Sequence, residues 1–194
     1  GYTTGTCAAA AAQACGQALL AGNFPHSLRI DTPAGIAVVV EPEEMHRGTD
    51  AQGTPWASCG VRKDAGDDAD ATDGALVVVR VSLVNTPGTT IEGGAGVGRV
   101  TRAGLDQPVG AAAINSVPRA MIASELERIA REHGWQGGFA VEVSVPGGEE
   151  IARKTFNPRL GIAGGISILG TSGIVRPMSE EALVDSIRLE MRMR

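Results

Sequence analysis

Glycine is the residue that most constrains how this chain can fold. The 194-residue sequence contains 27 glycines and 10 prolines, well above the roughly 12% that these two residues contribute to average proteins. The glycines gather at 92–98, 146–148 and 161–173, among apolar and β-branched residues, instead of spreading out as in a flexible linker. Clusters of this kind predict an ordered backbone that makes tight turns or closely approaches a ligand. Plain turns between short strands are the alternative.

Size and composition exclude several classes of protein. A chain of 194 residues fits one large domain or two small ones. Roughly 70% of the surface of an unfolded chain of this size is buried on folding, so no disulfide or metal is needed to hold a core. No apolar run approaches the ~18 residues that cross a bilayer, so no membrane partner is expected. The net charge of -5 and the 3% of aromatic residues argue against nucleic acid as a partner.

The three cysteines indicate a reducing compartment. Cys7, Cys15 and Cys59 are odd in number and have no C-x-x-C spacing, so neither a disulfide framework nor a zinc site is predicted. No secretory signal is recognisable in the sequence, and a cytoplasmic protein is therefore expected.

Local patterns predict the order of the helices and strands. Helices are predicted at 4–21, 118–133 and 179–192, from an alanine run, from apolar residues at helical spacing and from a serine cap, respectively. Strands are predicted at 28–31 and 36–41, which form a hairpin, and at 57–62, 75–84 and 138–145, with the valine-rich 75–84 at the centre. Residues 42–54 are interpreted as a loop or one short helix, 63–74 as a loop, and 151–177 as a buried strand that enters a close-packed turn. Because strands and helices do not alternate regularly, this order favours an α+β fold, a layered sandwich with helices packed on a mixed β-sheet, as one domain over residues 1–194.

One glycine cluster has the spacing of a cofactor loop. Glu92, Gly94, Gly96 and Gly98 satisfy the E-x-G-x-G-x-G pattern of nucleotide and S-adenosylmethionine loops and are candidate cofactor-binding residues. Such a loop should lie between a strand and a helix whose N-terminus faces the ligand, whereas the residues after Gly98 cannot continue as a long helix. The context therefore argues against a Rossmann site, and the sequence contains no P-loop pattern.

The segment 63–74 brings several carboxylates together. It could bind Ca²⁺ or Mg²⁺, but it lacks the glutamate at loop position 12 that an EF-hand requires, and a solvated acidic turn is an equal alternative. A third use is to stabilise a bound cation such as a sulfonium, or to orient basic side chains that hold an anion. The aspartates of this segment are Asp64, Asp67, Asp68, Asp70 and Asp73.

Threonine hydroxyls collect at the start of the first predicted helix. Thr3, Thr4 and Thr6 lie there beside backbone N–H groups that a helix leaves unpaired, which predicts an anion site. Plain capping of the helix, which needs one of these threonines, is an equal alternative. No serine or cysteine nucleophile motif accompanies any of the three histidines, so no hydrolase triad is predicted.

Five blocks of the sequence resemble, in the same order, those of the cobalamin-biosynthesis CbiD family, the cobalt-precorrin-5B (C1)-methyltransferases of the anaerobic pathway. The blocks are 1–10, which begins Gly-Tyr-Thr-Thr-Gly-Thr-Cys, 61–74, 92–102, 113–119 and 145–179, of which the last is the longest and most specific. Family members are usually close to twice this length and have a Rossmann-like second part after the last helix predicted above. The resemblance therefore implies that this chain is the amino-terminal domain alone.

The resemblance implies a methyltransferase that acts on carbon 1 of cobalt-precorrin-5B, with S-adenosylmethionine as methyl donor and cobalt carried by the tetrapyrrole substrate, so that no metal site of the protein is expected. A substrate fringed with carboxylates needs cations and hydrogen-bond donors. The candidate substrate-binding residues are Thr3, Thr4, Thr6, Lys63, Arg99, Arg102, Arg119, Lys154, Arg159 and Arg176. Asp64, Asp67 and Asp68 are candidates for a polar role beside the methyl donor or for orienting Lys63. A non-catalytic corrinoid-binding domain and a general anion-binding domain are the alternatives, and a homo-oligomer stays open.

Overall fold

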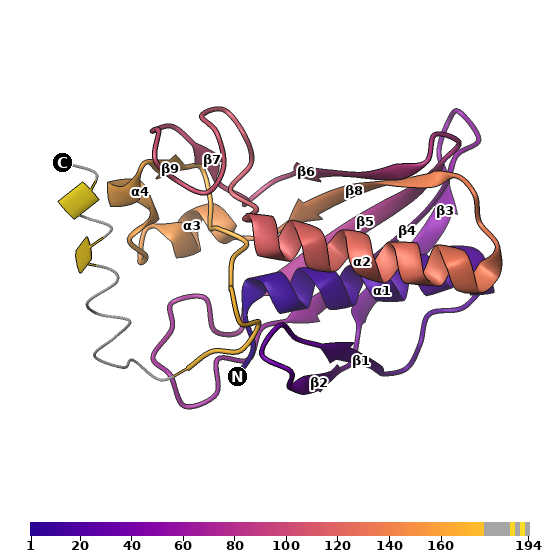
Figure 1. The fold of residues 1–194 in the computed structure, drawn as a ribbon, viewed down its shortest axis with the longest axis horizontal. Helices are drawn as coiled ribbons and strands as arrows, with labels where there is room; N and C mark the ends of the chain where they lie inside the picture. Colours follow the sequence, from indigo (N-terminus) through magenta and orange to yellow (C-terminus); the bar gives the residue numbers. More distant parts are fainter. Residues whose placement is uncertain (177–186, 189–190, 193–194) are drawn as a thin grey trace.

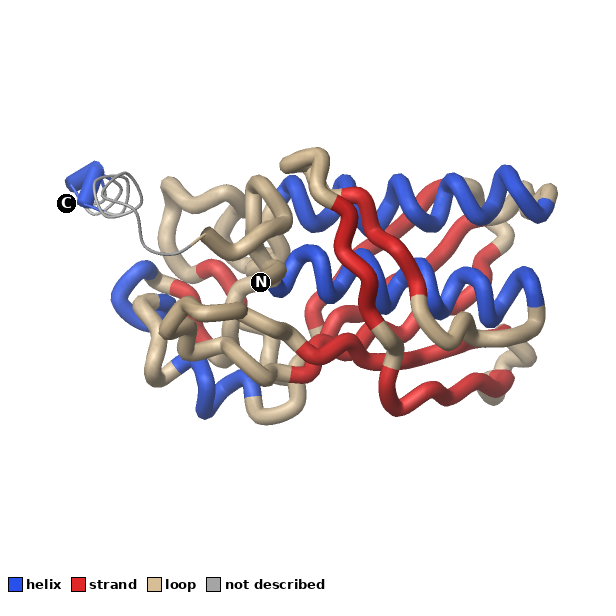
Figure 2. The backbone as a smooth tube through the Cα atoms, turned by 90° about the horizontal axis from the view of Figure 1, so that it is seen from below, coloured by secondary structure: helices blue, strands red, loops and turns tan. Residues whose placement is uncertain are grey.

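The fold has two layers, with two long helices over one face of a mixed β-sheet. The structure is a computed structural model that describes residues 1–176, 187–188 and 191–192 (Figure 1). Helix α1 (Thr4–Ala21) packs on strands β4 (Pro55–Arg62) and β5 (Leu76–Val84), and helix α2 (Ser116–His133) packs beside α1 and against β6 (Gly88–Gly93). Figure 2 shows the two helices from below, running side by side along the sheet. The predicted α+β class, a layered sandwich of helices on a mixed sheet, is confirmed.

The main sheet has five strands in the order β3-β4-β5-β8-β6, with β3 (Glu43–Thr49) at one edge and β8 (Gly138–Ser144) between β5 and β6. Neighbouring strands are antiparallel except for β6, which runs parallel to β8. Strand β5 lies in the middle, as predicted, with Val79 opposite Cys59 on one side and Val143 on the other. These three side chains are fully buried, so the core sits between this sheet and the helices.

The prediction of a loop or short helix over 42–54 is wrong, because residues 43–49 form the edge strand β3. Its side chains are exposed on both faces, apart from partly buried Glu43, so no alternation of apolar and polar residues marks it in the sequence. A register shift between Glu43 and His46, next to the positive φ of 50° at Glu44, interrupts its pairing with β4. Charged, irregular edge strands are common because they discourage pairing with other chains.

Both long helices were predictable from their sequences. Helix α1 spans the predicted 4–21, and Thr3 caps it by accepting a hydrogen bond of 3.2 Å from the backbone N–H of Thr6. Its small side chains allow it to lie close to the sheet, where Cys15 Sγ is 3.6 Å from Cys59 Sγ. Helix α2 begins slightly before the predicted 118 and ends at His133, as predicted, with Gly134 as its C-cap. The helix predicted over 179–192 lies mostly outside the described residues, and no helix within the described ranges is long and apolar enough to cross a membrane.

Smaller elements complete the fold. Strands β1 (Leu28–Asp31) and β2 (Ala37–Val40) form the predicted hairpin. Strand β7 (Arg99–Val100) pairs with β9 (Ile162–Ala163) at one end of the sandwich, where helices α3 (Gly148–Ala152) and α4 (Asn157–Leu160) also lie (Figure 1). The prediction of a buried strand for 151–177 is therefore right only in part, since α4 and β9 occupy its first half.

The three glycine clusters meet at this end of the fold. The N–H of Gly98 donates to Ile166 O at 2.8 Å, and the N–H of Ile166 donates to Gly96 O at 3.0 Å. The N–H of Val145 donates to Ala95 O at 2.8 Å. A Cβ atom at Gly96, whose φ is +77°, would lie 1.8 Å from Val145 O. Close approach of backbone to backbone, one of the uses predicted for these glycines, is therefore confirmed at Gly96.

Candidate functional site

A cleft of about 590 Å³ lies at the same end, where the N-terminus of α1, the loop 63–74 and α4 meet. We call it the end cleft; its lining includes Thr3, Thr4, Lys63, Asp70, Thr72 and Asn115, together with residues between 155 and 176. Its volume is within the range of about 300–1,000 Å³ that is usual for small-molecule sites. Two smaller clefts, of about 330 and 410 Å³, lie between the β1–β2 hairpin and α2 and beside α3.

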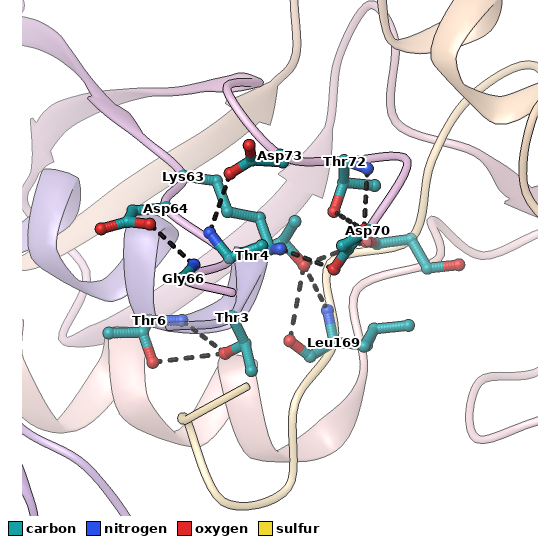
Figure 3. Close-up of polar contacts among 12 residues, drawn as sticks. Thr3, Thr4, Thr6, Lys63, Asp64, Gly66, Asp70, Thr72, Asp73 and Leu169 are labelled. Carbon is teal, nitrogen blue, oxygen red and sulfur yellow. Dashed lines mark hydrogen bonds and ion pairs between the residues drawn. The ribbon is translucent and has the colours of Figure 1, made fainter. Parts of the chain in front are cut away.

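An ion pair between Lys63 and Asp70 lies in the end cleft (Figure 3). Lys63 follows β4 directly, and its Nζ is 2.7 Å from Asp70 Oδ2. The side chain of Lys63 is 3% exposed and that of Asp70 is 28% exposed. Asp70 Oδ1 accepts hydrogen bonds of 2.7 Å from both the backbone N–H and the hydroxyl of Thr72. Burial alone would raise the pKa of the Asp70 carboxyl, but the hydrogen bonds from Lys63 and Thr72 and the charge of Lys63 hold it below its usual value.

The other aspartates of the loop 63–74 do not line the end cleft. Asp64 Oδ1 and Asp73 Oδ1 each accept a hydrogen bond from a backbone N–H of the loop, at 2.7 and 2.9 Å, and so hold its shape (Figure 3). The carboxylates of Asp67 and Asp68 accept no hydrogen bond from the residues that the structure describes. Asp70 is therefore the aspartate at the cleft, whereas Asp64, Asp67 and Asp68 were the predicted candidates. In the described part of the chain, no group of three or more His, Cys, Asp or Glu side chains is placed to hold a metal ion.

The three predicted threonines join the start of α1 to the segment 167–173. Thr4 Oγ1 donates to a carbonyl of this segment at 3.1 Å and accepts from one of its N–H groups at 3.0 Å. Thr6 Oγ1 donates to another of its carbonyls at 2.7 Å, and the N–H of Gly5 donates to the same segment at 3.0 Å. Thr3 acts as the helix cap. Thr3 and Thr4 line the end cleft, while Thr6 is fully buried, so capping and cross-linking account for these hydroxyls.

The predicted cations are not gathered in one concavity. Lys63 and Arg176 line the end cleft. Arg119 is turned toward the protein, because its Nε and Nη1 donate to two backbone carbonyls at 2.7 and 3.0 Å. Arg119 therefore connects the start of α2 to the end of β6.

Four further predicted cations lie around β7, β9 and α4, and we call them the cationic surface. Arg99 belongs to β7, Arg102 packs over the backbone that follows α4, Lys154 precedes α4 and Arg159 belongs to it. All four side chains are exposed. Helix α4 also contributes to the end cleft through Leu160, so the cationic surface and the cleft are adjacent.

The predicted cofactor loop at 92–98 leads into strand β7 and not into a helix, in agreement with the argument against a Rossmann site. Gly94 and Gly98 face side chains of β8 and β9. Gly96 lines the smaller cleft beside α3, and Glu92 is exposed. None of these four residues lines the end cleft, and their contact with a cofactor stays a prediction.

Several residues of the end cleft were missed by sequence reasoning. Phe156 and Leu169 line it with apolar side chains that are 72% and 45% exposed. Ser167 Oγ donates to Asn157 Oδ1 at 3.3 Å and so fixes another part of its wall. One feature of the sequence could have indicated Phe156: it is one of three phenylalanines in the chain, and it lies in a polar stretch where no core residue is predicted. Nothing in the sequence distinguishes Asp70 from the neighbouring aspartates.

Comparison with known proteins gives one consistent result. A family model described as CbiD matches residues 1–177. The chain is 48% identical over 194 residues to the cobalt-precorrin-5B C(1)-methyltransferase of Ruminiclostridium cellulolyticum, covering 100% of this chain and 49% of the relative. It is 51% identical over 187 residues to that of Burkholderia cenocepacia, covering 96% and 50%. The crystal structure of the cobalamin biosynthesis protein (cbiD) from Archaeoglobus fulgidus is similar with a TM-score of 0.65 and 33% identity, over 99% of this chain and 59% of that one. The chain thus spans about half the length of the curated relatives it matches.

Proposed function

Because this chain belongs to the CbiD family, we propose that it is the amino-terminal domain of a methyltransferase that transfers a methyl group from S-adenosylmethionine to carbon 1 of cobalt-precorrin-5B. The observation that carries the proposal is that the family-like blocks come together at the end cleft. Four of the five, at 1–10, 61–74, 113–119 and 145–179, contribute residues to the end cleft. The fifth, at 92–102, is hydrogen-bonded to the segment that forms the wall of this cleft.

The chemistry of methyl transfer fits the side chains at the end cleft. Displacement at a sulfonium carbon requires alignment of the two reactants and electrostatic support, and it needs no covalent nucleophile. S-Adenosylmethionine, when bound, supplies the electrophilic methyl group. The cleft offers the fixed carboxylate of Asp70, several hydroxyl groups and the apolar face of Phe156. The cysteines are buried, and burial raises the pKa of Cys7 to about 12 against the opposing charge of Lys63, so this thiol stays protonated.

In this proposal the cationic surface binds the substrate. Cobalt-precorrin-5B, the substrate in the names of the relatives, is a tetrapyrrole fringed with carboxylates, and guanidinium and ammonium groups are the side chains that bind carboxylates best. Cobalt enters within the macrocycle, so the domain needs no metal ligands of its own. The reaction takes place in the cytoplasm, where the buried cysteines stay reduced.

Binding and methyl transfer test the proposed function. Isothermal titration of this chain with cobalt-precorrin-5B should show binding, and mass spectrometry should detect the added methyl group when the other half of a full-length relative is supplied as a second polypeptide. Binding of the corrinoid with no methyl transfer by the full-length relative would instead support a non-catalytic corrinoid-binding domain. Binding of inorganic anions without preference for the corrinoid would support a general anion-binding domain.

One matched pair of variants tests the cationic surface. Arg159→Ala should weaken corrinoid binding more than tenfold, since a charge-assisted contact to a carboxylate is lost. Arg29→Ala is the control, because Arg29 is also exposed but lies on the β1–β2 hairpin, where it pairs with Asp31. Equal corrinoid affinities in the two variants would remove Arg159 from the site.

A further inference from the structure

We propose that the tetrapyrrole substrate lies across the mouth of the end cleft, with its flat ring on Phe156 and one of its carboxylates inside the cleft at Arg176. This inference rests on the proposed function and deepens it, because it assigns the ring and one carboxylate of the substrate to named residues. Two observations carry it: an exposed aromatic ring at the mouth of the cleft, and exposed cations without any carboxylate on the segments around that ring.

Phe156 presents its ring to solvent from a backbone that is held in place. It lines the end cleft and is 72% exposed, so it lies at the mouth of the cleft. Its carbonyl accepts hydrogen bonds of 3.0 Å from the N–H groups of both Arg159 and Leu160. Leu169, which is 45% exposed, lines the same cleft. An aromatic face that is exposed on a fixed backbone can stack on another flat ring without reorganisation of the fold.

The segments around this ring are basic, although the net charge of the protein is -5. Residues 99–105 and 151–176 contain five arginines and one lysine, and they contain no aspartate or glutamate. The exposed side chains of Arg102, Lys154 and Arg159 have no ion-pair or hydrogen-bond partner among the residues that the structure describes. These cations are therefore available to a ligand, and they attract one with negative charges.

The end cleft itself contains one further available cation. Of the charged side chains that line it in the described part of the chain, Lys63 and Asp70 are paired with each other at 2.7 Å, whereas Arg176 is exposed and has no partner there. Two neutral donors also line the cleft, namely the hydroxyl of Thr171 and the amide of Asn115, which precedes α2 without making a capping hydrogen bond. A guanidinium group assisted by such donors binds a carboxylate.

The arrangement of these groups matches the arrangement of charge on the ligand. A carboxylated tetrapyrrole has a flat apolar ring in the middle and carboxylates at its periphery. Phe156 offers a flat apolar surface, with Lys154 and Arg159 close to it in the sequence and Arg176 in the same cleft. A small anion would use the cations without the ring, and a neutral flat ligand would use the ring without the cations. A polycarboxylate built on a flat ring uses both.

Isothermal titration of this chain with two cobalt corrinoids tests the inference. Dicyanocobyrinic acid has free peripheral carboxylates, whereas dicyanocobinamide carries amides in their place. Phe156→Ala should weaken binding of both corrinoids about tenfold, because both contain the ring. Arg176→Ala should weaken binding of dicyanocobyrinic acid about fivefold and change that of dicyanocobinamide less than about twofold, because a guanidinium group pairs with a carboxylate and not with an amide.

The matched controls are Val109→Ala and Arg131→Ala. Val109 is an exposed apolar residue outside the cleft, and Arg131 is an exposed arginine at the end of α2 that lies away from Asn115. Both controls should keep the affinities for the two corrinoids within about twofold. Phe156 and Arg176 are themselves exposed, so thermal unfolding by circular dichroism should give their variants the melting temperature of the unsubstituted chain.

The outcomes separate the inference from the proposed function. Unchanged affinities for both corrinoids in Phe156→Ala overturn the inference, and so does an equal effect of Arg176→Ala on the two corrinoids or the absence of binding of dicyanocobyrinic acid to the unsubstituted chain. Displacement of dicyanocobyrinic acid by an equal concentration of citrate, a polycarboxylate without a ring, would also overturn it, because the site would then recognise charge alone. Each of these results is compatible with methyl transfer by a full-length relative. The proposed function fails by a different result, namely no methyl transfer to cobalt-precorrin-5B by such a relative.

Discussion

Removal of the carboxylate from the Lys63–Asp70 ion pair should be among the most destabilising polar substitutions in this chain. The Nζ–Oδ2 distance is 2.7 Å, and Lys63 is 3% exposed. Asp70→Asn leaves its ammonium buried beside a neutral amide, and breaking a fully buried pair costs about 3–5 kcal/mol. Because Asp70 is 28% exposed and water can reach its side of the pair, we expect a loss of about 2–3 kcal/mol in the free energy of unfolding. This loss lowers the melting temperature by roughly 5–10 °C.

Because Lys63 is more deeply buried than Asp70, substitutions of the two residues should cost different amounts of unfolding free energy. Lys63→Met removes the buried charge itself, and Asp70 keeps both hydrogen bonds from Thr72, so this variant should lose only about 1 kcal/mol. The double variant should be nearly as stable as Lys63→Met alone, with a coupling energy of about 2–3 kcal/mol. Urea unfolding followed by far-ultraviolet circular dichroism measures all four proteins. A coupling energy below about 0.5 kcal/mol, or a larger loss in Lys63→Met than in Asp70→Asn, would refute this reasoning.

Three other outcomes follow from the structure. The pKa of Asp70 is lowered in the folded protein, so its stabilising contribution is present above the ordinary aspartate pKa and disappears as pH falls through the lowered value. Below about pH 4 the unsubstituted protein should therefore lose more unfolding free energy than Asp70→Asn. Urea titrations of both proteins at each pH measure this difference. Gly96→Ala should cost more than about 3 kcal/mol because its Cβ would meet a backbone carbonyl, whereas Gly104→Ala, also at positive φ but in open space, should cost about 1 kcal/mol. Leu126→Ala, in the fully buried face of α2, should cost about 3 kcal/mol in chemical unfolding, and a loss no larger than that of the exposed control Val109→Ala would contradict the packing of α2 on α1.

The elements that could be predicted from the sequence are those that bury one side. Helix α2 carries Ile122, Leu126 and Ile129 at helical spacing, and all three are fully buried. Strand β8 alternates buried and less buried residues, which gives the period of two seen in its sequence. Strand β3 is exposed on both faces, so its pairing with β4 is a tertiary effect that leaves no periodic signal.

The end cleft could be predicted only in part. Thr3 and Thr4 were predicted as binding residues from their place at the start of the first helix, and both line the cleft. Lys63 and Arg176, which lie in family-like blocks, line it as well. The direction of a long side chain depends on its tertiary partners, so proximity to a glycine cluster did not show that Arg119 faces backbone carbonyls. The choice of one aspartate among five depends in the same way on the turns of the loop.

The glycine loop is connected to the end cleft through the segment 165–173, which is hydrogen-bonded both to this loop and to the start of α1. On one side this segment exchanges hydrogen bonds with the glycine loop, at Ile166 and Gly96; on the other it is bonded to the hydroxyl of Thr4. A displacement at Gly96 is therefore passed to the wall of a cleft that Gly96 does not line. The glycines that have the spacing of a cofactor loop therefore hold the wall of the end cleft in place without lining the cleft themselves. Substitutions at Gly96 should consequently reduce stability and ligand affinity together, whereas Phe156→Ala should reduce affinity while the melting temperature stays unchanged, because its ring is 72% exposed.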